Sequence, residues 1–388
     1  MINILIIEDE EPIRRVLFKI LKEEDNSFNI IEAKNGKQGF EAIQSNNEAD
    51  IVLCDIKMPI MDGIEVLKRS KKIKPELPFI MLTGHGNIHT AVEAMKLGAY
   101  DFISKPPDLN RLLTSVRNAI ESNKLKSENK NLKNRVYKNY EIIGNSPAIN
   151  SVKEIISKVA KTDARVLIIG ESGTGKELVA HQLHKQSNRN KESFVEVNCA
   201  AIPSELIESE LFGHMKGSFT SAIKNYSGKF EVANNGTIFL DEIADMSLNA
   251  QAKVLRALEE RNIQRVGSDK NIKIDVRIIA ATNKNLKDEI LKGNFREDLY
   301  HRLAVILIEV PSLNERIEDI TLLSNYFIEN LSKQQGGEIK TLSKDSVLML
   351  KDYNWTGNIR ELRNVIERLM ILGNNPISSD DIKKYAPK

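Results

Sequence analysis

The stretch Val166-Leu-Ile-Ile-Gly170-Glu-Ser-Gly-Thr-Gly175-Lys176 decides the fold class of the larger part of this chain of 388 residues. An apolar, β-branched run leads directly into a glycine-rich loop, and a helical pattern begins at its end. This order of strand, loop and helix is the context that a phosphate-binding loop requires. Backbone N–H groups of such a loop hold phosphate oxygens, and its lysine neutralises the β and γ phosphates. The candidate nucleotide-binding residues are Gly170, Glu171, Ser172, Gly173, Thr174, Gly175, Lys176 and Glu177.

A second apolar run, Thr237-Ile-Phe-Leu-Asp241-Glu242, ends in two adjacent acids. We expect Asp241 to bind the Mg²⁺ that accompanies ATP, and Glu242 to act as general base toward the attacking water. Two acids at a strand end can also be purely structural. The phosphate-binding loop in the same region favours the catalytic interpretation, even though Glu177 stands where such loops usually carry Ser or Thr.

The first part of the chain, residues 2 to about 120, alternates short apolar runs with helical patterns, which predicts a parallel sheet with helices on both faces. Ligands of such sheets bind at the carboxyl ends of the strands. The residues that end or follow these runs are Glu8, Asp9, Asp55, Thr83 and Lys105. Each of them alone could be a cap or a surface group, but all five at strand ends predict a phosphorylation site. The three carboxylates suit Mg²⁺, and we expect Asp55 to attack a phosphoryl donor and Lys105 and Thr83 to contact the resulting phosphate.

This part resembles a two-component receiver domain over residues 1–120. The resemblance rests on Asp55-Ile-Lys-Met-Pro-Ile-Met-Asp-Gly63, Thr83-Gly-His-Gly86 and Lys105-Pro-Pro107. It implies a flavodoxin-like five-stranded sheet, phosphorylation of Asp55 by a sensor histidine kinase, and a cis Lys105–Pro106 bond. Phe102 occupies the position of the aromatic switch residue of that family.

Residues from about 109 to 137 form a helical pattern, of which residues 121–140 make the helical linker between the domains. Two interpretations stay open here: a solvated linker, or a helix that dimerises the protein. The few apolar positions at heptad spacing do not decide between them.

The segment Glu210-Leu-Phe-Gly-His-Met-Lys-Gly-Ser-Phe-Thr-Ser-Ala222 lies between the phosphate-binding loop and the acidic pair, yet lacks groups for ATP chemistry. It closely resembles the ELFGHEKGAFTGA segment of sigma-54-dependent activators, which touches the sigma factor. Met215, Ser218 and Ser221 depart from that pattern. The residues expected to bind the partner are Gly217, Ser218, Phe219, Thr220, Ser221 and Ala222.

The span from Ile142 to about Ala386 resembles the AAA+ domain of NtrC-type activators, which implies an α/β ATPase subdomain at 141–312 and a helical lid at 313–388. The resemblance implies that Ile143 borders the adenine and that Asn198 pairs with Glu242. It makes Asn283 and Arg360 the two sensors of the nucleotide. It also implies that Arg296, Arg302 or both act on the ATP of a neighbouring subunit in a ring. The alternative for these arginines is an ion pair with Glu297 or Asp298.

The bulk properties limit the classes of function. A net charge of +2 argues against a broad nucleic-acid surface, and no helix-turn-helix pattern is evident in the dozen residues that follow Asn374-Asn-Pro376. No apolar run approaches the roughly 20 residues that span a bilayer, so we expect a cytoplasmic protein that does not bind membranes. Cys54 and Cys199 end apolar runs and are expected to be buried free thiols. His181 and His184 lie three residues apart without a thiol or carboxylate motif, so no zinc site is expected.

The leading hypothesis is a phosphorylation-controlled ATPase that uses ATP and Mg²⁺. It is a dimer when inactive and a ring when active, and it remodels sigma-54 RNA polymerase holoenzyme. The alternative hypothesis is a receiver-switched AAA+ signalling module that acts on a different protein partner.

Overall fold

The computed structural model describes residues 2–45, 49–84, 88–219, 222–335 and 338–386. The chain divides into two compact units, residues 1–136 and 137–388, which are described separately. No helix in the described ranges has the length and apolarity that a membrane crossing needs.

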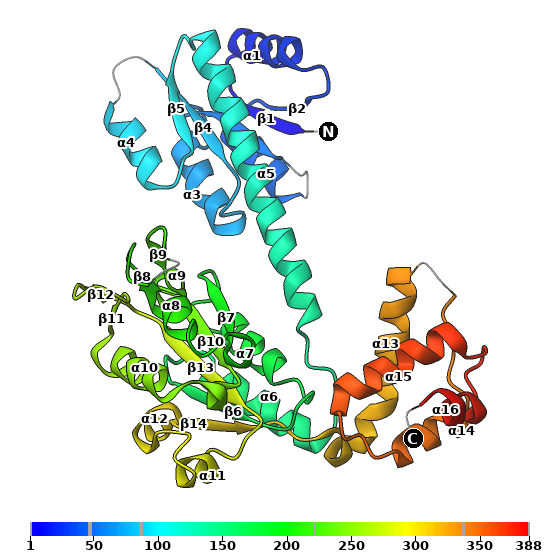
Figure 1. The fold of residues 1–388 in the computed structure, drawn as a ribbon. Coiled ribbons are helices and arrows are strands. Elements are labelled where there is room, and N and C mark those ends of the chain that lie inside the picture. Colours follow the sequence, from blue (N-terminus) through cyan, green and yellow to red (C-terminus); the bar gives the residue numbers. More distant parts are fainter. Residues whose placement is uncertain (1, 46–48, 85–87, 220–221, 336–337, 387–388) are drawn as a thin grey trace. The chain divides into compact units, whose positions relative to one another are not determined.

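The first unit contains a five-stranded parallel sheet with the order β2-β1-β3-β4-β5 (Figure 1). Its strands are β1 (Asn3–Ile7), β2 (Asn29–Ala33), β3 (Ile51–Asp55), β4 (Phe79–Thr83) and β5 (Asp101–Ser104). Its helices are α1 (Glu11–Glu24), α2 (Gly36–Gln44), α3 (Gly63–Ile73), α4 (Ile88–Lys96) and α5 (Leu109–Asn139). This order and the parallel pairing confirm the predicted flavodoxin-like sheet.

Apolar side chains on both faces of this sheet explain the uninterrupted apolar runs. In β1, Leu5 and Ile7 pack into the core on one face, and Ile4 and Ile6 pack into the core on the other. A parallel sheet covered on both faces buries every strand position, which an alternating pattern of apolar and polar residues could not satisfy.

Helix α5 confirms the expected helix of residues 109–137 and continues past residue 120 without a break. Leu112 and Val116 are buried against the sheet, and Ile120 packs beside them. The expected linker therefore forms the second half of the same helix. The cis Lys105–Pro106 bond that precedes α5 is also present.

The second unit contains a parallel sheet with the order β14-β6-β13-β10-β7. The strands are β6 (Val166–Ile169), β7 (Phe194–Asn198), β10 (Thr237–Asp241), β13 (Arg277–Thr282) and β14 (Ile306–Glu309). Around it lie α6 (Pro147–Val159), α7 (Lys176–Lys185), α8 (Ile207–Phe212), α9 (Lys229–Val232), α10 (Leu248–Glu260), α11 (Leu286–Leu291) and α12 (Glu297–Leu303). Two antiparallel pairs complete this part: β8 (Gly213–His214) with β9 (Tyr226–Ser227), and β11 (Asn262–Gln264) with β12 (Asn271–Lys273).

A helical part follows the sheet in the second unit. It consists of the 3₁₀ segment η3 (Leu313–Asp319) and the helices α13 (Ile320–Gln335), α14 (Lys344–Asp352), α15 (Asn358–Leu372) and α16 (Ser379–Tyr385). Helices α13 and α15 lie side by side (Figure 1). Trp355 is fully buried among them, and its indole N–H donates to the carbonyl of Leu350 at 2.9 Å.

A buried ion pair fixes the start of this helical part to the α/β part of the second unit. Arg316 and Asp319 are each 2% exposed, and their Nε and Oδ2 atoms lie 3.1 Å apart. Asp319 also accepts hydrogen bonds from the backbone of Asn145 and from both the backbone and the hydroxyl of Ser146. Arg316 donates to the carbonyl of Ile143. Together these bonds hold the chain segment just before α6 against η3.

Both cysteines are free and buried, as expected. Burial, followed by the nearby Asp241, raises the pKa of Cys199 to about 12. Burial also raises the pKa of Cys54, with Asp55 as the next cause. Neither thiol is therefore ionised at neutral pH.

Replacing Asp319 by Ala is expected to lower the free energy of unfolding of the second unit by about 3–5 kcal/mol, because Arg316 then loses its partner while buried. The single tryptophan of the chain, Trp355, provides the fluorescence signal for a urea titration. Asp380→Ala is the control, because its side chain is 90% exposed and the expected change is within about 0.5 kcal/mol. Equal urea midpoints for the two variants would contradict the role of the pair.

Candidate functional site

The predicted carboxylate pocket of the first unit forms at the carboxyl ends of β1 and β3. Ligand oxygens of Glu8, Asp9 and Asp55 all lie within 4.8 Å of one another. Lys105 Nζ lies 2.8 Å from Glu8 Oε2 and 2.7 Å from Asp55 Oδ2. Thr83 ends the neighbouring strand β4 and is buried, with its carbonyl accepting from the Lys105 backbone. The structure thus brings the predicted acids and the lysine together.

The charges in this pocket are only partly balanced. Glu8 is fully buried, and burial raises the pKa of its carboxyl group, with Asp55 adding to the shift against the hydrogen bond from Lys105. Burial acts to lower the pKa of Lys105, but its hydrogen bonds to Asp55 and Glu8 outweigh that effect and raise it. The lysine therefore stays charged. Its positive charge offsets only part of the negative charge of the carboxylates, so the pocket favours binding of a further cation.

Phe102 lies on β5, in the strand next to Thr83. Its ring is partly buried against the sheet core, and the guanidinium of Arg111 lies 5.7 Å from the ring centroid. Arg111 also donates to the Phe102 carbonyl at 3.1 Å. The ring is therefore held from the α5 side as well as by the core.

The phosphate-binding loop joins β6 to α7, as predicted. Gly173 and Gly175 have φ values of +78° and +97°, which glycine adopts without strain. Lys176 is 7% exposed, and its Nζ donates to the carbonyls of Gly170 and Glu171 at 2.9 and 3.2 Å. Those contacts hold the lysine over the loop.

The acidic pair lies at the end of β10, next to Lys176. Glu242 Oε1 lies 3.6 Å from Lys176 Nζ, and Glu242 Oε2 accepts from the backbone N–H of Asn283 at 3.0 Å. Burial raises the pKa of Asp241, and the Glu242 carboxylate raises it further. The two acids thus face the loop with excess negative charge, which suits a Mg²⁺·ATP ligand.

Asn198 does not make the implied pair with Glu242 in this structure. Its Oδ1 instead accepts from the backbone N–H groups of Ala200 and Ala201 at 3.1 and 3.2 Å. The side-chain oxygen caps the 3₁₀ helix η1 (Cys199–Ala201), whereas the amide N–H₂ group, which a pair with the Glu242 carboxylate would use, takes no part in this cap.

The candidate arginine fingers lie at the start of α12 (Arg296, its N-cap) and in its last turn (Arg302). Arg296 forms an ion pair with Asp298 through two bonds of 3.0 and 2.6 Å within this single chain. Arg302 is not paired with Glu297 or Asp298; its Nε lies 3.9 Å from Glu259. Both arginine side chains are largely exposed, at 41% and 44%.

The first turn of α15 docks on the phosphate-binding loop, a contact that the sequence alone did not indicate beyond Arg360. Asn358 is fully buried, and its amide donates to Glu171 Oε2 and to the Ser172 carbonyl at 2.9 and 3.1 Å. Arg360 Nη1 lies 3.2 Å from Ser172 Oγ. A Cβ atom on Gly173 would lie 2.4 Å from the Gly357 carbonyl, so this position requires glycine. Asn358 has a positive φ of 54°, which is uncommon for a residue other than glycine. This backbone angle could not be read from the sequence.

A cavity of about 290 Å³ lies between the loop and the helical part. Ile143, Thr174, Gly175 and Arg360 line it, with Leu178 among several apolar residues. Mostly apolar walls with a few polar groups suit a flat base such as adenine. The predicted position of Ile143 beside the base is compatible with this cavity.

The expected partner loop is anchored at its base. Phe219 is half-buried, with its ring centroid 4.9 Å from that of His214 in an edge-on arrangement. Ser218 donates to the Met215 carbonyl at 2.8 Å. Ala222 is buried and its carbonyl accepts from Gly217, so Ala222 supports the loop rather than presenting a contact surface. Thr220 and Ser221 lie outside the described residues.

A second hairpin, β11–β12, supports this loop. It was not predicted from the sequence. Met215 N donates to the Val266 carbonyl, and Val266 N donates to the Gly213 carbonyl. Gly267 has a φ of +79°, and a Cβ atom there would lie 2.7 Å from Ser218 Cβ. The sequence signal was the glycine between two short β-type runs.

Comparison with known proteins identifies the modules. Residues 4–117 match the response regulator receiver domain, residues 142–309 the sigma-54 interaction domain, and residues 314–387 the AAA+ ATPase lid domain. The regulatory protein AtoC of Escherichia coli (strain K12) is 43% identical over 378 residues, which are 97% of this chain and 81% of AtoC. The chain belongs to the sigma-54-dependent response regulators.

Two further relatives agree with this assignment. The DNA-binding transcriptional regulator NtrC of Proteus hauseri is 43% identical over 95% of this chain and 78% of NtrC. The crystal structure of NtrX from Brucella abortus in complex with ATP has a TM-score of 0.78 and 40% identity, over 98% of this chain and 83% of NtrX. The sigma-54-dependent regulator described here is thus a two-component transcriptional regulator with a phosphorylatable receiver and an AAA+ ATPase unit.

Replacing Glu242 by Gln is expected to lower the rate of ATP hydrolysis by about 10²–10⁴-fold, the usual contribution of a general base. ATP binding should persist, because Lys176 and the loop backbone are unchanged. Steady-state hydrolysis and calorimetric ATP titration measure the two properties. Glu154→Gln on the exposed side of α6 serves as control, and equal hydrolysis by the two variants would refute the assignment of Glu242.

Proposed function

We propose that phosphorylation of Asp55 controls ATP hydrolysis by the AAA+ unit, and that hydrolysis remodels sigma-54 RNA polymerase holoenzyme for promoter opening. The observation that carries this proposal is the continuity between the hydrolysis site and the loop at 210–222. Strand β7 ends at Asn198, and the chain continues through η1 and α8 into that loop. The helix η1 packs against η2 (Ile243–Asp245), which directly follows Glu242. A change at Glu242 during hydrolysis therefore has a short route to the loop.

In the receiver, Asp55 accepts the phosphoryl group from a sensor histidine kinase. The residues fit a Mg²⁺ ion, because Glu8, Asp9 and Asp55 offer oxygen ligands and carry negative charge that Lys105 only partly offsets. Bound there, the ion would neutralise charge on the incoming phosphoryl group. The Asp55 oxygen attacks phosphorus while the bond between phosphorus and the histidine nitrogen of the kinase breaks and that imidazole leaves. Lys105 pairs with the phosphoryl oxygens, and the Thr83 hydroxyl donates to one of them. The Phe102 side chain then changes its packing in response to the phosphorylation of Asp55.

In the AAA+ unit, the adenine occupies the cavity beside Ile143 and the phosphates lie on the loop from Gly170 to Glu177. Asp241 would hold the Mg²⁺ of the nucleotide. Glu242 takes a proton from the water whose oxygen attacks the γ-phosphorus, and the bond between that phosphorus and the bridging oxygen breaks so that ADP leaves. Asn283 and Arg360 contact the phosphate end as sensors. The hydrogen bond of Glu242 to the Asn283 backbone supports this arrangement, because it orients the base next to a second polar group.

Assembly completes the site in this proposal. Arg296 and Arg302 are exposed, so a neighbouring subunit's nucleotide can reach them in a ring, where arginine stabilises the charge of the transferred phosphate. Glu259 and Asp298 then lose their arginine partners. The chain is a dimer when inactive and forms the ring on phosphorylation.

In a second candidate function, the ATPase is the same but the protein that it remodels is different. Met215 and Ser218 differ from the activator pattern, and Ser218 packs against Gly267. A loop altered in this way fits a receiver-switched AAA+ module that remodels a different protein. Binding of sigma-54 separates the two candidates.

The phosphoryl mimic beryllofluoride, added with Mg²⁺, is expected to change the ATPase rate by about fivefold or more, the usual size of an allosteric coupling, and to increase the particle mass. Asp55→Asn should abolish both responses because the mimic needs the carboxylate. Asp25→Asn, at an exposed position of the same unit, should respond like the unchanged protein. An absent response in the unchanged protein would rule out the coupling.

Phe219→Ala is expected to weaken capture of sigma-54 by about 2 kcal/mol or more, as for other buried aromatic contacts. Capture is measured on immobilised sigma-54 with ADP and aluminium fluoride, which mimic the transition state. Leu291→Ala removes an apolar side chain that is 87% exposed on α11, and this control should bind normally. If the unchanged protein does not bind sigma-54, the second candidate is favoured.

A further inference from the structure

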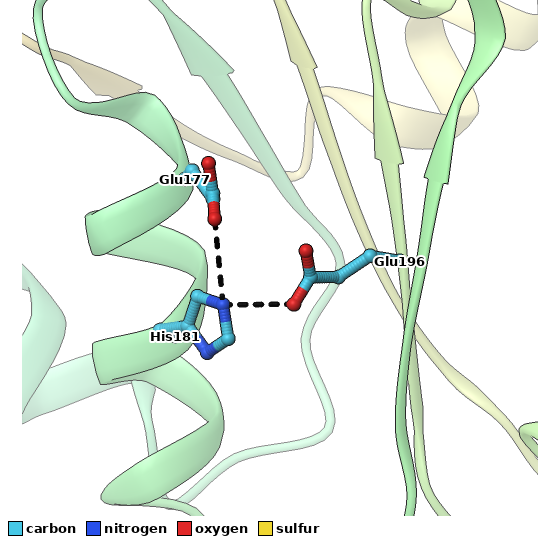
Figure 2. Close-up of side chains that lie close together, drawn as sticks. All are labelled: Glu177, His181 and Glu196. Carbon is cyan, nitrogen blue, oxygen red and sulfur yellow. Dashed lines mark ion pairs between the residues drawn. The ribbon is translucent and has the colours of Figure 1, made fainter. Parts of the chain in front are cut away.

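A histidine and two glutamates meet beside the phosphate-binding loop: Glu177 is the last residue of that loop, and His181 and Glu196 have no part in the ATP site described above. His181 Nε2 lies 2.8 Å from Glu196 Oε1 and 3.8 Å from Glu177 Oε1 (Figure 2). One ligand atom from each of the three residues lies within 4.8 Å of the other two. Such spacing allows one ion to contact all three side chains.

The fold brings these residues together for a simple reason. Glu177 and His181 are four residues apart on α7, so they share one face of the helix. Glu196 lies on β7, which is the edge strand of the sheet, and its side chain points toward that face (Figure 2). No thiol or carboxylate motif is evident around His181 in the sequence, because Glu196 comes from a different element, the strand β7. His184 is not part of the cluster; its Nδ1 lies 3.0 Å from the Thr237 hydroxyl.

The imidazole of His181 is held rigidly with a nitrogen that lacks a hydrogen bond. His181 is 4% exposed, and its Nε2 has no hydrogen-bond partner in the described part of the chain, since the close Glu196 oxygen lies outside the direction that an N–H needs. Tyr140 stacks on the ring with centroids 3.4 Å apart, and Phe194 lies 4.5 Å away on centroids. A buried nitrogen without a partner costs free energy unless a ligand satisfies it.

The charge of the cluster points to a cation. Among the described residues, neither Glu177 nor Glu196 forms an ion pair with a lysine or an arginine. Both carboxylates are partly exposed, with side chains 51% and 42% accessible, so an ion can enter from solvent. The buried imidazole nitrogen and the two accessible carboxylate oxygens thus form a partly solvent-accessible site with one nitrogen and two oxygen donors.

We propose that Glu177, His181 and Glu196 bind a first-row divalent metal ion of the Zn²⁺ class, with water in the remaining position. The imidazole nitrogen excludes Mg²⁺ and Ca²⁺ as the preferred ions, because both favour oxygen ligands. Imidazole with carboxylates is a donor set that Zn²⁺ uses in proteins. The ion joins the first turns of α7, which begins with Lys176, to the strand that ends at Asn198.

The test is a calorimetric titration of the full chain with Zn²⁺, without nucleotide and in excess Mg²⁺, which occupies the oxygen-rich pocket of the receiver. We expect one Zn²⁺ per chain at this site. His181→Gln and Glu196→Gln should each weaken that binding by more than about tenfold, because losing a ligand costs at least as much as losing an outer partner. Glu192→Gln, an exposed glutamate just before β7, is the matched control and should bind like the unchanged protein.

A thermal melt provides a second test of the same site. Zn²⁺ should raise the melting temperature of the unchanged protein and of Glu192→Gln, but not of Glu196→Gln, because binding to the folded state stabilises it. Glu196 is partly exposed, so its substitution tests the site even if His181→Gln fails to fold. The proposal is overturned if the unchanged protein binds no Zn²⁺ in excess Mg²⁺, or if Glu196→Gln binds it as tightly as the control.

Discussion

The contact between Asn358 and the phosphate-binding loop is the constraint on which the nucleotide site depends. A buried amide satisfies both Glu171 and Ser172, and its own oxygen accepts from the backbone of Leu313 at 2.7 Å. One side chain therefore ties the loop to η3 and to α15 at once. Because the amide is fully buried, each of these bonds would leave an unsatisfied polar group if broken. The contact thereby positions the loop whose Thr174 and Gly175 line the cavity next to Ile143.

The same physical problem recurs in both units: negative charge is gathered where parallel strands end. In the receiver, Lys105 bridges Glu8 and Asp55. In the AAA+ unit, Lys176 lies near Glu242 but leaves Asp241 with a raised pKa. Repulsion between these acids lowers the stability of the empty sites. Binding of a cation near these acids would relieve that repulsion.

Features that depend on a short stretch of sequence could be predicted, whereas contacts between residues on different elements could not. Asp55, Lys105 and Asp241 could be placed because each ends an apolar run, and parallel topology then gathers such ends at one edge. Asn358 could not be placed on the loop, because its partner Glu171 is 187 residues away and the contact depends on how the lid packs. Glu196 was missed beside His181 because it lies on a different element, the strand β7. Asn198 was assigned to Glu242 by resemblance, whereas its side-chain oxygen accepts from local backbone N–H groups here.

The close approach of Gly267 to Ser218 has a consequence for how the partner loop can vary. The backbone at Gly267 already occupies the left-handed region, and there is no room for a side chain beneath Ser218. Residues 218 and 267 therefore occupy one small volume. A larger residue at one of the two positions requires a smaller residue at the other. Ser218 and the hairpin residue below it are therefore coupled, so redesigning the loop for a new target means choosing residues 218 and 267 together.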